Sequence, residues 1–146
     1  PEHGYPILVG VASGFIITWA GFGVGMARKK YKIPYPQASS AASPLPSSCC
    51  ILYSSNPVAF NCIQRAHQNC LENYPLFIML LGISSVARPT AAAVLGGIRL
   101  AGFILYVKGY RTGDPGKRQR GAIGYIGLLG MIGLSLELAY RLITSD

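Results

Sequence analysis

Apolar residues occur along this chain in four long windows, which are separated by short and strongly polar segments. An α-helix rises about 1.5 Å per residue, so about 20 apolar residues cross a bilayer core of about 30 Å. The pattern therefore predicts an all-α integral membrane protein, built as a bundle of four transmembrane helices. The helices are expected at about residues 5–27, 57–87, 90–111 and 120–143.

The composition supports a membrane protein and argues against a nucleic-acid-binding one. Of the 146 residues, 51% are hydrophobic and only 12% are charged, whereas a soluble domain has about 25% charged residues. The mean hydropathy is +0.37. The net charge of +8 would by itself suit a nucleic-acid partner, but a nucleic-acid-binding surface does not leave half the chain apolar.

The connections indicate how the helices follow one another. Pro57 comes after a Ser-Asn pair, which is a capping pattern followed by a helix-starting proline. Arg88 and Pro89 are the whole link between the second and third helices, which should therefore form an antiparallel hairpin. Residues 33–56 are rich in Pro and Ser and are expected to form an atypical loop. We expect residues 1–146 to form one domain.

Basic residues gather after the first and third helices. These two segments hold Arg28, Lys29, Lys30, Lys32, Arg111, Lys117, Arg118 and Arg120. The opposite side offers little beyond Arg88 and the termini. Because cytoplasmic loops carry an excess of Lys and Arg, both basic segments are expected in the cytosol and both termini across the membrane.

The start of the second helix is unusually polar for a membrane span. Arg65, Asn69 and Glu72 are spaced i, i+4 and i+7, so they share one helix face. Holding such a charge in a membrane segment costs about 2.5–3.5 kcal/mol, which favours a functional site. One interpretation places these side chains in the headgroup zone, with Glu72 paired to Arg65. The other is a site for a small zwitterion, with Arg65 for a carboxylate, Asn69 for an amide and Glu72 for an ammonium group.

The third helix carries two kinds of candidate residue. Tyr106 and Tyr110 are spaced i and i+4, so they lie on one face near the basic end. Tyrosines are common at that membrane depth, so their position alone does not decide between an aromatic belt and a site. Arg99 lies deeper in the same helix and needs a partner. Glu137 of the fourth helix is the expected one, in a structural pair.

The cysteines and the second basic segment give the last chemical clues. Cys49, Cys50, Cys62 and Cys70 show no metal-ligand spacing, and they are expected to be free thiols, with no metal required. The run of Lys117, Arg118 and Arg120 can serve only to set topology. It can also place a guanidinium beside a thiol, which lowers the pKa of that thiol from about 8.5.

Four stretches carry a resemblance to a known family. The second helix contains FNCIQRAHQN and then ENYP, the stretch after the first helix is ARKKYKIPYP, and the third helix runs into LYVKGYRTGDPGKRQRGAIG. These stretches resemble the MAPEG family, the membrane-associated proteins in eicosanoid and glutathione metabolism, and within it the glutathione transferase branch. The resemblance covers nearly the whole chain except residues 37–51, which are either a genuine loop insertion or an artefact of the gene model.

The resemblance implies a homotrimer of four-helix subunits with glutathione as co-substrate, bound between neighbouring subunits near the cytosolic side. By resemblance, the glutathione-binding residues are Arg28, Arg65, Asn69, Glu72, Asn73, Tyr106 and Tyr110. Lys29 corresponds to an acid directed toward the second substrate, and Arg118 to the arginine that activates the thiol, with Lys117 as the alternative. The chain departs from the family pattern at His67, Asn73 and Phe103.

The activity implied is that of a membrane-bound glutathione transferase and glutathione peroxidase. It would conjugate lipophilic electrophiles such as leukotriene-type epoxides, or reduce lipid hydroperoxides. The alternative is a non-catalytic lipid-binding scaffold of the lipoxygenase-activating type. The expected location is the endoplasmic reticulum membrane, with the outer nuclear and mitochondrial outer membranes as alternatives.

Overall fold

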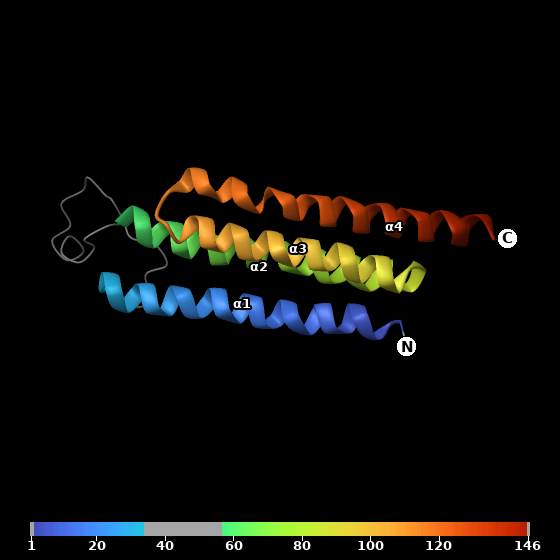
Figure 1. Ribbon diagram of the computed structural model, residues 1–146, viewed down its shortest axis with the longest axis horizontal. Coiled ribbons are helices and arrows are strands. Elements are labelled where there is room, and N and C mark those ends of the chain that lie inside the picture. Colours follow the sequence, from blue (N-terminus) through green and yellow to red (C-terminus); the bar gives the residue numbers. More distant parts are fainter. Residues whose placement is uncertain (1, 34–56, 146) are drawn as a thin grey trace.

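The computed structural model describes residues 2–33 and 57–145. Within these ranges the chain forms four long helices, joined in one place by a 3-10 helix. They are α1 (Gly4–Tyr31), α2 (Pro57–Ala87), α3 (Pro89–Tyr110), η1 (Pro115–Ile123) and α4 (Gly124–Thr144). The long helices lie side by side, and each is long and apolar enough to cross a membrane (Figure 1). The predicted all-α bundle of four membrane-spanning helices is confirmed.

The order of the helices in space follows from the short connections. α2 and α3 run antiparallel in the middle of the bundle, and α1 and α4 each pack against both of them (Figure 1). The two chain termini lie at one end of the bundle together with Arg88, which links α2 to α3. We refer to this end of the bundle as the hairpin end. The opposite end contains the last turns of α1 and α3 together with η1, and we refer to it as the η1 end.

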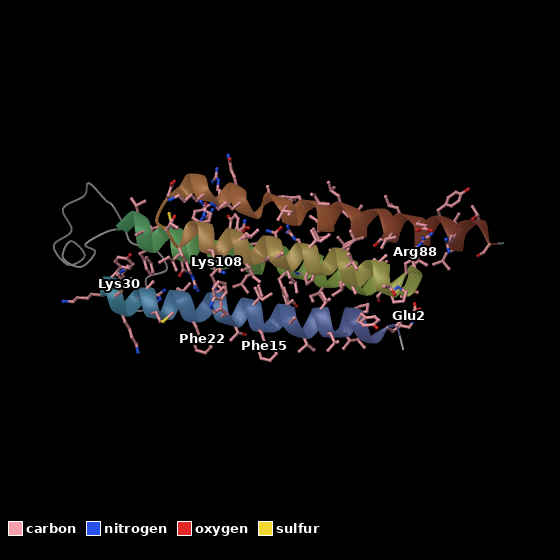
Figure 2. The ribbon with its side chains drawn as sticks, in the orientation of Figure 1. Glu2, Phe15, Phe22, Lys30, Arg88 and Lys108 are labelled. Carbon is pink, nitrogen blue, oxygen red and sulfur yellow. The ribbon has the colours of Figure 1, made fainter. Side chains whose placement is uncertain are left out.

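The bundle has an apolar core and an apolar outer surface. Phe77 and Met131 are fully buried, and Phe103 and Val107 pack in the same cluster. Phe15 on α1 nevertheless points away from the bundle and is 73% exposed (Figure 2). Helices that are hydrophobic all round are typical of membrane spans, since lipid covers their outer face.

Glycines bring α3 and the start of α4 into direct backbone contact. A Cβ atom on Gly102 would overlap the Cα atom of Gly124. A Cβ atom on Gly121 would lie 2.6 Å from the Cβ atom of Tyr106. Neither position leaves room for a side chain, so Gly102 and Gly121 both require glycine. Small residues allow such close helix contacts in membranes, and here they hold η1 against α3.

Two helix boundaries differ from those expected. α1 continues to Tyr31, past the predicted end at residue 27, and Lys32 ends it in the left-handed conformation with φ of 53°. The fall in hydropathy after residue 27 predicts where the chain leaves the membrane, but not where the helix ends. Lys and Arg are good helix formers and are favoured at helix C-termini, so the helix continues through the basic residues. The fourth α-helix begins at Gly124 rather than at 120, because residues 115–123 form the 3-10 helix η1.

The predicted pair of Arg99 with Glu137 is wrong. Glu137 Oε1 instead accepts hydrogen bonds from Arg88 Nη2 at 2.7 Å and from Arg141 Nη2 at 2.6 Å. Glu137 is therefore level with the hairpin end. Arg99 is further along α3 from Arg88 by about 16 Å of helix, too far for Glu137 to reach it.

The two cysteines in α2 are as expected. Cys62 and Cys70 are both free and buried. The thiol of Cys62 lies 3.9 Å from the carbonyl oxygen of Gly113, which belongs to the segment after α3. Cys49 and Cys50 lie outside the described residues, as do residues 34–56 of the predicted loop.

Candidate functional site

The turn after α3 determines where the second basic segment lies. The Gly113 N–H donates to the Tyr110 carbonyl oxygen at 3.0 Å, and Gly113 has φ of 79°, a conformation that suits glycine. Asp114 then caps η1, because its Oδ1 accepts from the Gly116 N–H at 2.9 Å. The chain reverses over these few residues, and η1 packs back along α3.

The reversal brings Arg118 beside the two tyrosines of α3. Arg118 Nη1 lies 3.5 Å from the hydroxyl oxygen of Tyr110. The rings of Tyr106 and Tyr110 meet edge to face, with 5.0 Å between their centroids. The tyrosines lie on α3 and the arginine on η1, but the three side chains are adjacent in space. The predicted tyrosine pair and the predicted arginine therefore belong to one cluster.

A pocket of about 340 Å³ opens beside this cluster at the η1 end. Its walls come from α2, α3, η1 and α4. The lining residues are Asn69, Arg99, Gly102, Phe103, Tyr106, Arg118, Gln119, Gly121, Ala122 and Tyr125. The pocket thus unites three of the predicted site residues, namely Asn69, Tyr106 and Arg118. The described residues that line it include two guanidinium groups and no carboxylate, so an anionic ligand would suit the charge of the pocket.

Arg99 lines this pocket, although the sequence analysis assigned it to a structural pair. The residue is only 4% exposed, and its Nη2 donates to Asn73 Oδ1 at 3.1 Å. Its guanidinium also lies 4.5 Å from the ring centroid of Phe103 and 5.2 Å from that of Tyr125. The signal that could have identified it is its charge deep in a spanning helix, since such residues mark functional sites by default.

Asn73 lies behind the pocket rather than on its wall. Its Oδ1 is occupied by Arg99, and its Nδ2 donates to the backbone oxygen of Asn69 at 2.9 Å and approaches Asn69 Oδ1 at 3.5 Å. The side chain expected to contact glutathione therefore directs both its polar groups toward the protein.

Arg65 and Glu72, the other members of the predicted polar face, are exposed on α2 and do not line the pocket. Glu72 Oε1 accepts a hydrogen bond from Gln68 Nε2 at 3.1 Å. The alternative pairing of Glu72 with Arg65 is not among the ion pairs of the described residues.

Arg28 and Lys29 line a second groove, of about 500 Å³, on α1. The other residues of this groove are Phe22, Gly25, Met26, Lys32 and Ile33. The Arg28 guanidinium lies 5.7 Å from the ring centroid of Phe60. Within a single chain, these two predicted residues are thus separate from the pocket that Arg118 lines.

Lys117 and Arg118, the two residues that the sequence analysis considered for activating the thiol, lie in different surroundings. Lys117 Nζ lies 3.7 Å from Asp114 Oδ2, and Lys117 is not among the residues that line the pocket. Arg118 lines it directly. The two side chains are neighbours in the sequence, but the 3-10 helix turns them in different directions, and only Arg118 of the two lines the pocket. The sequence pattern did not predict this 3-10 helix.

Comparison with known proteins places this architecture in a family. The model of the MAPEG family matches residues 6–140 of the chain. The chain belongs to the MAPEG family. It is also similar to microsomal glutathione S-transferase 2 of Homo sapiens, with 31% identity over 114 residues. The matched region covers 75% of this MAPEG chain and 66% of the human protein, slightly less than two thirds of its length. The family resemblance seen in the sequence is confirmed.

Proposed function

We propose that this MAPEG protein is a membrane-bound glutathione transferase that also acts as a glutathione peroxidase. The observation that carries the proposal is the pocket at the η1 end, where Asn69, Tyr106 and Arg118 line one cavity. The similarity to a microsomal glutathione S-transferase supports glutathione as the ligand. Glutathione is a small tripeptide with two carboxylates, one ammonium group and one thiol, and a pocket without its own carboxylate suits its net negative charge.

The homotrimer is part of this proposal. Arg65 and Glu72 face outward from α2, and Arg28 and Lys29 lie on the separate groove of α1. A second copy of the chain, packed against the pocket, would join these groups into one site. Arg28 and Arg65 would then hold the carboxylates and Glu72 the ammonium group. Tyr110 would support the site by contacting Arg118, and Asn73 by contacting Asn69.

Arg118 is the proposed activating residue. The thiolate is the reactive form of a thiol, and a neighbouring cation lowers the thiol pKa from about 8.5 to as low as about 3.5 in favourable surroundings. With the guanidinium beside the thiol, the sulfur of glutathione would be ionised at neutral pH and would add a negative charge to those of the carboxylates.

Two reactions follow from the bound thiolate. With an epoxide, the sulfur forms a bond to carbon, the carbon–oxygen bond breaks, and the oxygen takes up a proton, for which Lys29 is the proposed donor. With a lipid hydroperoxide, the sulfur attacks the terminal oxygen, the oxygen–oxygen bond breaks, and the departing alkoxide takes up a proton from water. This yields the lipid alcohol and the sulfenic acid of glutathione, which a second glutathione converts to the disulfide and water.

The proposed location is the endoplasmic reticulum membrane with the η1 end in the cytosol, where glutathione is available. The basic residues at this end support that orientation. A cysteine-accessibility experiment on vesicles would test it, with a cysteine introduced at Lys30 or Ser145 in a variant that carries serine at Cys49 and Cys50. Labelling of the Lys30 position from the lumen would contradict the orientation.

Arg118→Ala tests the function most directly. We expect glutathione-dependent turnover of lipid hydroperoxides and epoxides, measured in liposomes, to fall by about 10²–10³-fold. Removing the cation raises the thiol pKa, so the acidic limb of the pH–rate profile should move to higher pH, by about one unit or more.

Lys117→Ala is the matched control, since it removes the adjacent cation that does not line the pocket. Turnover should stay near the level of the unaltered protein. Loss of turnover in Lys117→Ala but not in Arg118→Ala would transfer the activating role to Lys117. Lipid binding without any glutathione turnover by the unaltered protein would favour the scaffold alternative instead.

A further inference from the structure

Arg99 occupies an unusual position for a cation. It lies about two helical turns before Tyr106 on α3, or about 10 Å further into the bundle from the η1 end. It is 4% exposed, and in the described part of the chain its buried Nε has no hydrogen-bond partner. A buried charge of this kind is costly, so a role beyond packing is expected of it.

The hydrogen bond from Arg99 sets the orientation of the Asn73 amide. A guanidinium has five N–H donors and no acceptor, so it can bond only to the oxygen of an amide. Asn73 therefore must turn Oδ1 toward Arg99 Nη2, at 3.1 Å. Its Nδ2 then points the other way and donates to Asn69, at 2.9 Å from the backbone oxygen and 3.5 Å from Oδ1.

The orientation of the Asn73 amide in turn sets the orientation of the Asn69 amide. The Asn69 oxygen Oδ1 faces the Nδ2 of Asn73, which leaves the Asn69 Nδ2 group for the pocket that Asn69 lines. An amide that is free to rotate can present either its oxygen or its nitrogen to a ligand. Here the buried cation removes that choice, because reversing Asn73 would place two donors against each other.

We propose that Arg99 and Asn73 are positioning residues that make Asn69 a hydrogen-bond donor toward the ligand. The pocket then selects a carbonyl or carboxylate oxygen at this point, and not an ammonium group. The proposal rests on the proposed function, since glutathione is the ligand that it concerns.

Asn69→Asp tests the direction of the hydrogen bond. Aspartate can accept from Asn73 as before, but it cannot donate to a ligand. Binding of glutathione to the full-length protein in detergent, measured by calorimetry, should weaken about tenfold or more. Tighter binding would mean that Asn69 presents its oxygen to the ammonium group, and would overturn the proposal. Asn69→Leu removes the donor without adding a charge, and it should weaken binding as well. Unchanged binding in Asn69→Leu would overturn the proposal, because the loss in Asn69→Asp would then come from the added charge alone.

Asn73→Asp tests the positioning role. It keeps an acceptor for Arg99 but cannot donate to Asn69. The glutathione KM should rise about three- to tenfold with little change in kcat, whereas a merely structural residue would leave KM unchanged. In an Asn69→Ala background, Asn73→Asp should cause no further rise. Arg99→Lys, which keeps a donor, should retain more affinity than Arg99→Met.

The outcomes separate this proposal from the function on which it rests. If the unaltered protein does not bind glutathione, both are overturned. If it binds glutathione and Asn69→Asp does not weaken the binding, only the positioning proposal fails. Asn69 lies on the pocket wall, so its variant decides the direction of the hydrogen bond even if Asn73→Asp does not fold.

Discussion

The two ends of the bundle both contain arginines, but they balance the charge in different ways. At the hairpin end, the carboxylate of Glu137 lies between Arg88 and Arg141, so the chain supplies both partners. At the η1 end, Arg99 and Arg118 line one pocket whose walls contain no carboxylate. At the first end, Arg88 connects the α2–α3 link to α4, and Arg141 pairs with Glu137 within α4. The arginines at the second end have room for an anion from outside the chain.

The comparison shows that the presence of a charge in a membrane span does not reveal its role. Arg99 and Glu137 are the obvious intramembrane pair in the sequence, yet each has other partners. An acid that meets two arginines is a structural link. A cation that contacts an amide and aromatic rings, beside a cavity, is a candidate for binding. The surroundings of each charge decide its role.

Gly121→Ala should have the largest effect on the stability of the η1 end. The added Cβ atom would lie 2.6 Å from the Cβ atom of Tyr106 and 2.9 Å from the Gly102 carbonyl oxygen, so η1 must move away from α3. Such overpacking costs about 1–3 kcal/mol, and the movement displaces Arg118 as well. We expect a lower thermal unfolding midpoint in detergent together with a loss of turnover.

Gly133→Ala on α4 is the matched control. Apart from the adjacent backbone of α4 itself, no atom of residues 2–33 and 57–145 lies within 4 Å of the position of its Cβ atom. The substitution should therefore be neutral or stabilise the helix, by up to about 1 kcal/mol. Equal destabilisation by the two alanines would show that close contact at the η1 end is not what Gly121 provides.

Tyr110→Phe should have a smaller effect, confined to activity. It removes the hydroxyl oxygen that lies 3.5 Å from Arg118 Nη1 and leaves the ring in place. Turnover should fall about two- to tenfold, as expected from the loss of one hydrogen bond, with the unfolding midpoint almost unchanged. Tyr140→Phe on the exposed surface of α4 should change neither quantity. Full turnover in Tyr110→Phe would show that the tyrosine does not help to hold the arginine.

Glu137→Gln should have the smallest effect. It removes the charge that Arg88 and Arg141 share at the hairpin end, but exposed ion pairs contribute little to stability. The unfolding midpoint should fall by less than in Gly121→Ala, and glutathione turnover should not change. A loss of turnover as large as that in Arg118→Ala would contradict the claim that the charges at the hairpin end are structural and that only those at the η1 end serve the site.

The helices were predictable because each depends on local sequence. A window of apolar residues is enough to predict a membrane span, and Arg88-Pro89 leaves too little chain for anything except a hairpin. The boundaries were less accurate at the η1 end. There, residues 115–123 form a 3-10 helix that begins at Pro115, and hydropathy does not reveal it.

The sequence by itself determined the four spans, their antiparallel order and the end of the bundle where the basic residues lie. Only the tertiary structure decided which side chains meet across helices. It placed Arg99 against Asn73 rather than Glu137, and Arg118 rather than Lys117 on the pocket wall. These contacts depend on how far each helix is rotated and shifted along its neighbour. Close glycine contacts such as that between Gly102 and Gly124 set this register, and residue spacing along one helix contains no information about it.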